Sequence, residues 1–445
     1  MDIIELEDVL SKLQTALERD DLAQAAAIIG SLRPADQADL IEALSGQDQV
    51  ALLAQLKPAE SADVLEEMVD EHAAALAELL SPTKLGEILD EMEVDEAVDV
   101  LKDLDPQQAA AALREMEEPQ TVIPLMRYPD DTAGGLMTAA VITLRRSWTA
   151  REALAELRRV GPHSDSTYYL FVVDDEDVLL GVVGLRELVT APENELIGEI
   201  MIKDIVSVPV TMDQEDCARL LSRHGFLALP VVDELGRFAG VITADDLIEV
   251  TENEATEDMY RMVGITGEER VFGPAKVSVL KRIPWLAINM VTLFIAITVV
   301  DFFEPIIAAL VTLAIFLPLV SGEGGNAGSQ TATVIVRGLA LGELSVSDTR
   351  RALSKELKVS FINGAIIGLG TGLVAFVWKQ DWRIAAAIFL AMILNFLMAA
   401  STGVLIPLGL QKMKVDPALA SAAFVTGFTD TFGFLFFLGI VALLM

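Results

Sequence analysis

Residues 418–445 read ALASAAFVTGFTDTFGFLFFLGIVALLM, and this apolar stretch decides the fold class. About 20 mostly apolar residues are enough for a helix to cross a bilayer, so we predict a membrane span here. Asp430 is the one ionisable residue of the stretch, and a charge at that depth is costly unless it faces water, is neutralised or is paired. Because the predicted spans contain no basic residue except Arg337, at the very end of the second, we expect Asp430 to line a pore.

Four further stretches upstream are long and apolar enough to span the membrane. They are Pro284–Val300, Pro305–Arg337, Phe361–Val377 and Ile384–Leu410. Basic residues gather in the loops around residues 350–358 and 412–414, whereas Asp301 and Glu304 mark the first short turn. Because cytoplasmic loops are enriched in Lys and Arg, the N-terminus is expected in the cytoplasm and the C-terminus, after five spans, outside. This pattern predicts a multi-pass protein of the inner or plasma membrane, in contact with the lipid bilayer.

The second predicted span is interrupted by a polar, glycine-rich stretch, GEGGNAGSQT, at residues 322–331. Glycine permits an unwound turn or the close approach of helices, and amide side chains supply neutral oxygens. One interpretation places Asn326, Gln330 and, from the last span, Thr426 along the pore. The other makes the stretch a helix-packing motif. Asn395 in the fourth span is expected to hold helices together.

The charge of the chain is concentrated before the spans. Residues 271–445 contain 9 acidic and 12 basic side chains out of 67 and 32 in the whole chain, so the first 270 carry 58 and 20, a net charge of −38. Such a region repels nucleic acid and anionic lipid, and divalent cations would relieve its self-repulsion. A merely soluble acidic surface is the alternative. Cys217 is the single cysteine, which excludes an intrachain disulfide and a multi-cysteine metal site. The first ten residues contain no basic signal-peptide region, so we expect this part in the cytoplasm.

A repeat runs through residues 1–128. Leu-x-Pro recurs every 24 residues, at Leu32–Pro34, Leu56–Pro58, Leu80–Pro82 and Leu104–Pro106. Proline suits the first turn of a helix, and a fixed period of this length is typical of a solenoid of short helix pairs. The pattern indicates a binding scaffold.

Residues 129–252 alternate strands and helices in two β-α-β-β-α units that resemble tandem CBS domains. The predicted strands are Val141–Leu144, Tyr169–Val173, Gly181–Val183, Ile205–Val208, Ala228–Val232 and Gly240–Thr243. The resemblance rests on LPVVD at 229–233 and GVITADDL at 240–247. The first unit has GVVGLREL at 181–188, without the Thr and Asp that usually hold a ribose.

A predicted linker helix at residues 253–275 follows, and its start is acidic. Glu254, Glu257 and Asp258 share one face at i, i+3 and i+4, so they repel one another in the absence of a counter-ion. Asp246 and Glu249 lie one or two turns earlier, and the solenoid contributes a further set: Asp63, Asp95 and Asp99. A metal-binding role and a solvated acidic face both fit these carboxylates individually.

The order of these parts resembles the MgtE family of Mg²⁺ transporters. Its marks here are YPDDTAGGLMT at 128–138, EATED at 254–258, PLVSGEGGNAGSQ at 318–330 and DPALAS at 416–421, followed by Asp430. The resemblance implies a homodimer with Asp430 as the pore carboxylate and the linker helix as a plug. It implies Mg²⁺ as both substrate and regulatory ligand of the cytoplasmic carboxylates, namely Asp63, Asp95, Asp99, Asp246, Glu249, Glu254, Glu257 and Asp258. Some members bind ATP in the CBS pair, which makes Arg186 and Phe226 candidate contacts.

The fold class we predict is therefore multidomain: an α-helical solenoid, a tandem CBS (α+β) domain, a linker helix and a transmembrane domain of five helices at 276–445. The function we predict is a Mg²⁺ channel or transporter that cytoplasmic Mg²⁺ closes. Mg²⁺ keeps most of its waters, so few direct ligands suffice. The alternative is a secondary transporter for another divalent cation or small solute, regulated by nucleotide. We predict no enzymatic activity, because the sequence shows no Ser/His/Asp set, Walker loop or paired catalytic carboxylates, and His72, His163 and His224 are isolated.

Overall fold

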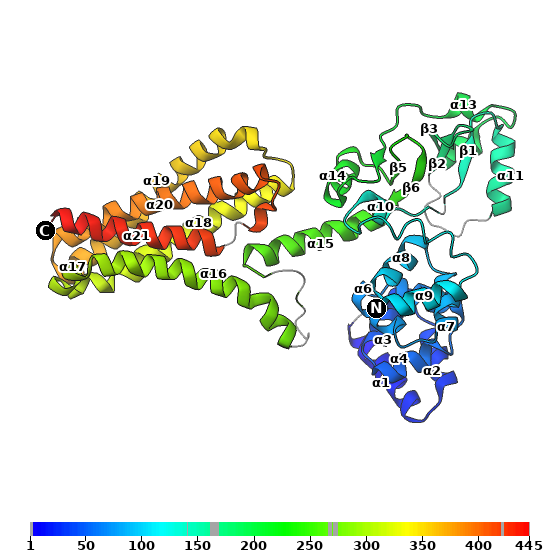
Figure 1. Cartoon of the computed structure of the whole chain (residues 1–445), viewed down its shortest axis with the longest axis horizontal. Coiled ribbons are helices and arrows are strands. Elements are labelled where there is room, and N and C mark those ends of the chain that lie inside the picture. The colour runs from blue at the N-terminus through cyan, green and yellow to red at the C-terminus, as the bar shows by residue number, and fades with distance from the viewer. Residues whose placement is uncertain are drawn as a thin grey trace. The chain divides into compact units, whose positions relative to one another are not determined.

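The computed structural model describes residues 3–139, 141–160, 169–265, 269, 275–419 and 422–444. The chain forms two compact units, Met1–Thr251 and Glu252–Met445, which are described separately below. Helical repeats and two small sheets make up the first unit, and long helices make up the second (Figure 1).

Among the described residues the solenoid has nine helices, and from the second helix on their starts keep the predicted period of 24 residues. Their bounds are α1 Ile3–Glu18, α2 Leu22–Ile29, α3 Pro34–Glu42, α4 Gly46–Leu53, α5 Pro58–Glu66, α6 Asp70–Ala77, α7 Pro82–Leu89, α8 Val94–Asp103 and α9 Pro106–Glu115. Each predicted proline is the first residue of a helix, where its missing N–H costs nothing. The same repeat position is buried each time, at Leu40, Val64, Ile88 and Ala112. The predicted repeat of helix pairs is confirmed.

The two CBS units have matching three-stranded sheets. The strands are β1 Thr143–Arg145, β2 Tyr169–Val173, β3 Leu179–Gly184, β4 Val208–Pro209, β5 Ala228–Val232 and β6 Phe238–Thr243. In each sheet the first pair is parallel and the second antiparallel, with a register shift at the last pair of the hairpin. The helices of these units are α10 Ala133–Leu136, α11 Ala150–Val160, α12 Leu185–Thr190, α13 Ile197–Ile200 and α14 Gln214–His224. The first strand of each unit begins two or three residues later than the sequence predicts.

Helix α15 spans Ala244–Met262, where the sequence predicts one short helix and then a separate linker helix. The chain continues helically past Val250 because no proline or glycine follows until Gly264, whose positive φ of 80° suits a turn. Residues 266–268 and 270–274 of the predicted linker lie outside the described residues.

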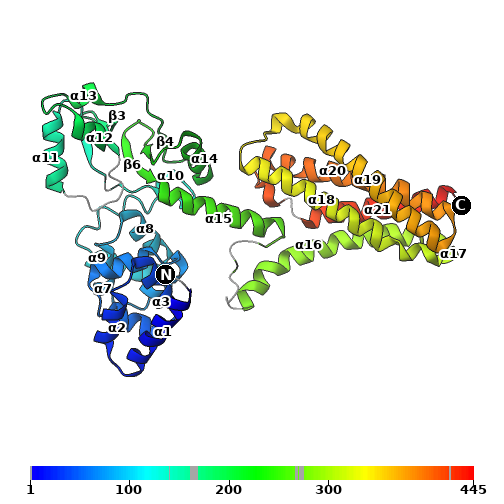
Figure 2. The ribbon, with the colours of Figure 1, turned by 180° about the vertical axis from the view of Figure 1, so that it is seen from behind.

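In its described residues the second unit is a bundle of five long helices with short connecting elements. The long helices are α16 Ala275–Phe302, α18 Leu317–Ala340, α19 Thr349–Lys379, α20 Trp382–Lys412 and α21 Ala422–Leu444. The connecting elements are α17 Glu304–Ala309, η1 Val311–Ile315, η2 Val346–Asp348 and η3 Pro417–Leu419. Helices α18, α20 and α21 pack on one another, α19 lies along α20 and α16 along α21, as both views show (Figures 1 and 2).

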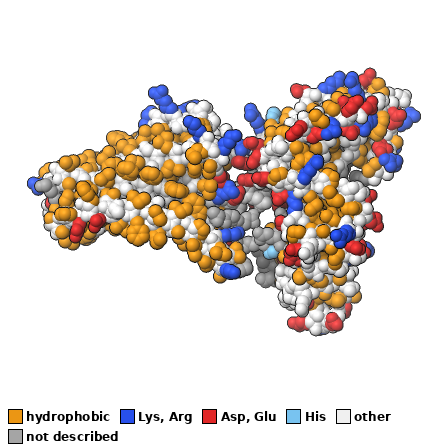
Figure 3. Space-filling model, viewed as in Figure 1, with side chains coloured by type: hydrophobic (Ala, Val, Ile, Leu, Met, Phe, Trp, Pro, Cys, Tyr) orange, Lys and Arg blue, Asp and Glu red, His pale blue; other side chains and the backbone are white. Residues whose placement is uncertain are grey.

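Four helices of the described chain are long and apolar enough to cross a membrane: α16, α19, α20 and α21. Hydrophobic side chains cover most of the visible surface of this unit in Figure 3, as lipid contact requires. Helix α18 falls short of that composition because it contains the glycine-rich polar stretch. The sequence prediction of a helical membrane domain is confirmed.

The predicted start of the second span, Pro305–Arg337, is wrong, because no single helix begins at Pro305 and runs to Arg337. The chain forms α17 and η1 first, and the long helix begins only at Leu317. Leu310 leaves the helical region with φ −137° and ψ 73°, and Pro318 stands in the first turn of α18, where it supports a new helix start. The predicted interruption at 322–331 is absent from the described structure, since α18 runs through it without a break.

Candidate ion site and carboxylate clusters

Asp430 lies on α21 with only 5% of its surface exposed. Ser321 of α18 donates its hydroxyl to Asp430 Oδ1, and among the described residues no Lys or Arg pairs with this carboxylate. A carboxylate buried between membrane helices without a counter-charge is costly, so it indicates a functional position. The prediction that Asp430 is an unpaired acid inside the bundle is consistent with this geometry.

Glycines of α18 bring it close to α21 beside this carboxylate. A Cβ on Gly328 would lie 2.3 Å from Val425, and a Cβ on Gly325 would lie 3.6 Å from Thr426. Both glycines are buried, so the stretch acts as a packing motif on this face of α18. Thr426 is half-buried beside Gly325, which places one predicted pore residue at the α18–α21 contact.

The other two predicted pore residues lie elsewhere on α18. Asn326 and Gln330 are one turn apart and exposed, and Thr333 extends this polar stripe by another turn. Hydrocarbon cannot hydrogen-bond to amide side chains, so a stripe of this kind in a membrane helix faces protein or water and not lipid. The sequence missed Ser321, because a single serine in an apolar helix gives no signal without the helix packing.

Asp95 and Asp246 form the most buried carboxylate pair of the first unit. Asp95 on α8 is 7% exposed, and its Oδ1 is buried without a hydrogen-bond partner in the described structure. Burial, and next the charge of Asp246, raise the pKa of Asp95 well above its usual range. Burial also raises the pKa of Asp246, although Thr243 donates its N–H at 2.8 Å and its hydroxyl at 2.6 Å to Asp246 Oδ2. An orphan oxygen beside a second carboxylate fits a divalent cation.

The remaining predicted ligands of the first unit are more open. Asp63 and Glu249 are exposed, and Asp99 is half-buried, with Lys102 at 3.8 Å. Glu66, which the sequence did not single out, is half-buried and accepts the N–H of Glu93 at 2.6 Å, and burial raises its pKa. Across the described ranges no three Asp, Glu, His or Cys side chains converge on a ready-made metal site.

The acidic face of α15 meets the connection between α20 and α21 within the second unit. Arg261 forms ion pairs with Glu257 on its own helix and with Asp416. Burial, the nearby Asp416 and then Glu254 raise the pKa of Asp258 to about 6. This cluster therefore combines Glu254, Glu257, Asp258 and Asp416 with one guanidinium. The sequence singled out the first three as candidate ligands but not Asp416.

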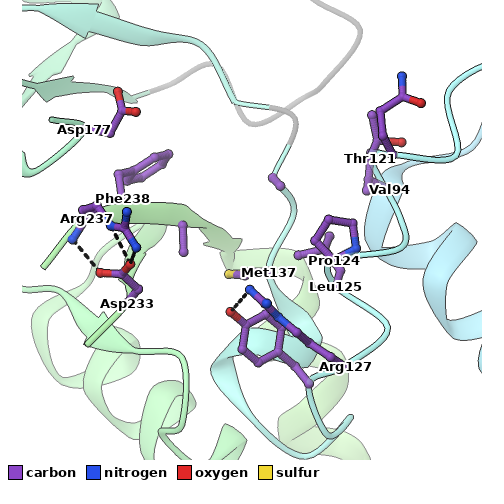
Figure 4. Close-up of a pocket in the computed structure, with 14 residues that line it drawn as sticks. Val94, Thr121, Pro124, Leu125, Arg127, Met137, Asp177, Asp233, Arg237 and Phe238 are labelled. Carbon is purple, nitrogen blue, oxygen red and sulfur yellow. Dashed lines mark hydrogen bonds and ion pairs between the residues drawn. The ribbon is translucent and has the colours of Figure 1, made fainter. Parts of the chain in front are cut away.

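The predicted nucleotide contacts, Arg186 and Phe226, do not line the cavity described here for the first unit. Arg186 is 88% exposed at its side chain and lies 3.3 Å from Glu187, and Phe226 stacks on His224 with ring centroids 5.1 Å apart. The cavity, about 470 Å³, lies between the β5–β6 turn and residues 120–139 (Figure 4). Its charged groups are already engaged: Arg237 with Asp233, Arg127 with the Tyr128 hydroxyl, and Asp177 with Arg145.

Membrane-length helices around an isolated carboxylate, joined to a CBS pair and an acidic helical repeat, define a membrane transport protein. Sequence models of three families match: the divalent cation transporter MgtE at 317–440, the MgtE intracellular N domain at 32–131, and the CBS domain at 133–194 and 197–253. The magnesium transporter MgtE of Thermus thermophilus is 36% identical over 325 residues, 72% of each chain. That of Bacillus subtilis is 32% identical over 324 residues, 73% of this chain and 72% of its own. The chain belongs to the MgtE family of magnesium transporters.

Two solved structures resemble the first unit of this chain. The cytosolic domain of the Mg²⁺ channel MgtE in complex with ATP is 35% identical with a TM-score of 0.52, and covers 54% of this chain and 99% of its own. The soluble part of a magnesium transporter is 30% identical with a TM-score of 0.51, and covers 56% of this chain and 99% of its own. The solenoid and CBS pair described above therefore form a known fold.

Proposed function

We propose that this chain is a Mg²⁺-selective channel or transporter of the inner or plasma membrane and that Asp430 contacts the permeating ion. The observation that carries the proposal is the buried carboxylate on α21, whose single recorded partner in the described structure is the hydroxyl of Ser321. One neutral donor leaves the negative charge for a cation. Mg²⁺ keeps several waters, so one carboxylate and neutral oxygens suit its passage better than a cage that would trap it.

The working assembly in this proposal is a homodimer with the pore on the two-fold axis. Asn326 and Gln330 on the exposed face of α18 support it, because such amides need a second copy or a water path beside them. Two copies of Asp430 would then face one hydrated ion. The N-terminus is cytoplasmic and the C-terminus outside, in agreement with the basic residues in the first turns of α16 and of α19.

Cytoplasmic Mg²⁺ closes the pore in this proposal. Burial and then the neighbouring carboxylates raise the pKa of Asp95 and Asp258. Ions between Asp95 and Asp246, and among the carboxylates around Asp258, would offset both effects. Helix α15 contains Asp246 and Asp258 at its two ends, so ion binding at either end acts on the same helix. An ion that binds the compact state better than the open state shifts the equilibrium towards closure.

Nucleotide regulation is a further part of the proposal, because the related cytosolic domain was solved in complex with ATP. Arg186 is exposed and Phe226 offers a ring for stacking, which makes both available to a nucleotide. The first CBS unit lacks the Thr and Asp that the second has at Thr243 and Asp246. ATP titration with Arg186→Ala and Phe226→Ala tests this assignment.

The test of the central proposal is Mg²⁺ flux into proteoliposomes containing the full chain. Asp430→Asn keeps the size of the side chain and removes its charge, so we expect flux to fall to background. Asp381→Asn is the matched control, because Asp381 only caps α20 and asparagine caps a helix equally well. Undiminished flux through Asp430→Asn would exclude the carboxylate from the ion path.

A further inference from the structure

Asn395 is a fully buried amide in the middle of α20. Its exposed fraction is 0%, and Nδ2 donates to the carbonyl oxygen of Val320 on α18 at 2.9 Å. Its Oδ1 is buried as well and has no partner among the described residues. An amide costs free energy in an apolar interior unless its bonds compensate, so the side chain has a task beyond filling space.

Glycines on two other helices make room for this amide. A Cβ on Gly324 of α18 would lie 2.1 Å from Asn395 Nδ2, and a Cβ on Gly433 of α21 would lie 2.7 Å from the same atom. Distances this short are not tolerated, so any larger residue at either position displaces the amide. Three helices therefore close around one side chain.

The bond from Asn395 leads directly to the ion site. Val320 precedes Ser321, whose hydroxyl donates to Asp430 Oδ1, and Gly433 follows Asp430 by three residues on α21. The carbonyl of Val320 has two lone pairs, so it accepts from Asn395 while remaining part of the helix. The amide thus fixes α18 against α20 at the residue next to the one that holds the carboxylate.

We propose that Asn395 is a positioning residue for the permeating ion: it sets the place of Ser321 and, through it, the carboxylate of Asp430. The inference rests on the proposed function of Asp430. An apolar side chain of similar volume fills the same space but makes no directional bond, so packing and positioning are separable. Mg²⁺ demands tighter geometry than Ca²⁺, so a misplaced carboxylate weakens discrimination between the two ions.

The experiment is a double-mutant cycle on the full chain in proteoliposomes, with half-saturating Mg²⁺ and the Mg²⁺/Ca²⁺ flux ratio as readouts. Asn395→Leu and Ser321→Ala should each raise half-saturating Mg²⁺ about fivefold, as expected for one lost hydrogen bond, and lower the flux ratio. In the double variant, half-saturating Mg²⁺ and the flux ratio should change no more than in either single variant, because both substitutions act through one contact. Ser401→Ala, which removes only a bond within α20, should match the wild type.

The inference is overturned if the effects on half-saturating Mg²⁺ multiply in the double variant, or if Asn395→Leu behaves like the wild type. It is also overturned if Ser401→Ala raises half-saturating Mg²⁺ as much as Asn395→Leu does. Asp430→Asn distinguishes failure of the proposed role of Asp430 from failure of the positioning role of Asn395. Wild-type flux through it removes the proposed function, whereas an inactive Asp430→Asn beside a normal Asn395→Leu removes only the positioning role.

A second pair of variants covers the case in which Asn395→Leu does not fold. Gly324→Ala keeps the amide but pushes its Nδ2 off the Val320 carbonyl, and alanine favours the helix. Gly439→Ala on α21 is the control, since nothing lies within 4 Å of its Cβ. Gly324→Ala should reproduce the rise in half-saturating Mg²⁺ and the lower flux ratio, while Gly439→Ala should not. Equal behaviour of the two overturns the inference.

Discussion

Arg261 and Asp416 form an ion pair across 155 residues of sequence, and Arg261 also pairs with Glu257. The guanidinium therefore occupies the space between carboxylates of α15 and of the α20–α21 connection. It supplies a permanent positive charge where the proposed gating needs Mg²⁺. Arg261 and Mg²⁺ would both neutralise these carboxylates, so the guanidinium limits how much negative charge remains for the ion to neutralise.

The first prediction concerns this pair. Arg261→Gln should loosen α15 when Mg²⁺ is absent and leave it docked when Mg²⁺ is present, because the ion then replaces the lost charge. A partly exposed ion pair contributes up to about 1 kcal/mol, so we expect hydrogen exchange of residues 252–260 to rise about two- to fivefold without Mg²⁺. Arg151→Gln, which breaks an exposed pair with Glu193, is the control. Equal exchange in both variants at zero Mg²⁺ would refute the role of Arg261.

The second prediction is a pH dependence set by Asp258. The pKa of Asp258 is raised from its ordinary value of 3.8 to about 6, so the folded cluster takes up a proton as the pH falls through 6. The docked helix therefore gains stability as the pH falls from about 6 to about 3.8. The proton also competes with Mg²⁺. Half-inhibiting cytoplasmic Mg²⁺ should therefore be higher at pH 5.5 than at pH 7.5.

Asp258→Asn provides the matched comparison for that pH effect. The variant cannot titrate at this position, so the difference in half-inhibition between the two pH values should shrink. Carboxylates in the same cluster remain, which keeps Mg²⁺ inhibition itself measurable. A pH difference as large as that of the wild type would assign the titration to another group.

The third prediction concerns Asp95, whose charge is buried next to Asp246. The raised pKa means that the charged form destabilises the fold at neutral pH, and stability should increase as pH falls. Asp95→Asn should therefore stabilise the Mg²⁺-free chain by about 1 kcal/mol, and the thermal midpoint should rise by about 2–4 °C. Mg²⁺ should then add less stability than in the wild type. Asp39→Asn on the exposed face of α3 should change neither value.

The sequence prediction is accurate where a feature depends on neighbouring residues in the chain, and less accurate where it depends on packing. Proline acts on its own backbone, so the starts of α3, α5, α7 and α9 were predictable to the residue. Composition alone indicated the membrane helices, but it joined α17, η1 and α18 into one span because apolar residues continue from α17 through η1 into the first turn of α18. The break at Leu310 depends on the backbone there and on how the following helix packs, which composition does not report.

Partners of the site residues that are far away in the sequence could not be predicted from the sequence. Asp430 was found because a lone acid in an apolar stretch is visible, whereas Ser321 is 109 residues away and resembles any helical serine. Asn395 was expected to hold helices together, and it does, but its link to Val320 and hence to the ion site needed the packing of α18 on α20. Asp416 belongs to a quoted motif, yet nothing in that motif pointed to Arg261.

The last prediction uses Cys217, the single cysteine of the chain. It is fully buried on α14, and burial, with the charges of Asp213 and Asp216, raises its thiol pKa to about 12. Thiolate is the reactive form, so a maleimide should label the folded protein slowly at pH 7.5 and the unfolded protein at once. If Mg²⁺ compacts the cytoplasmic part, labelling should slow further as Mg²⁺ rises. Ser222→Cys in a Cys217→Ala background is exposed on the same helix and should react quickly at every Mg²⁺ concentration. Identical Cys217 labelling rates with and without Mg²⁺ would show that ion binding does not reach the second CBS unit.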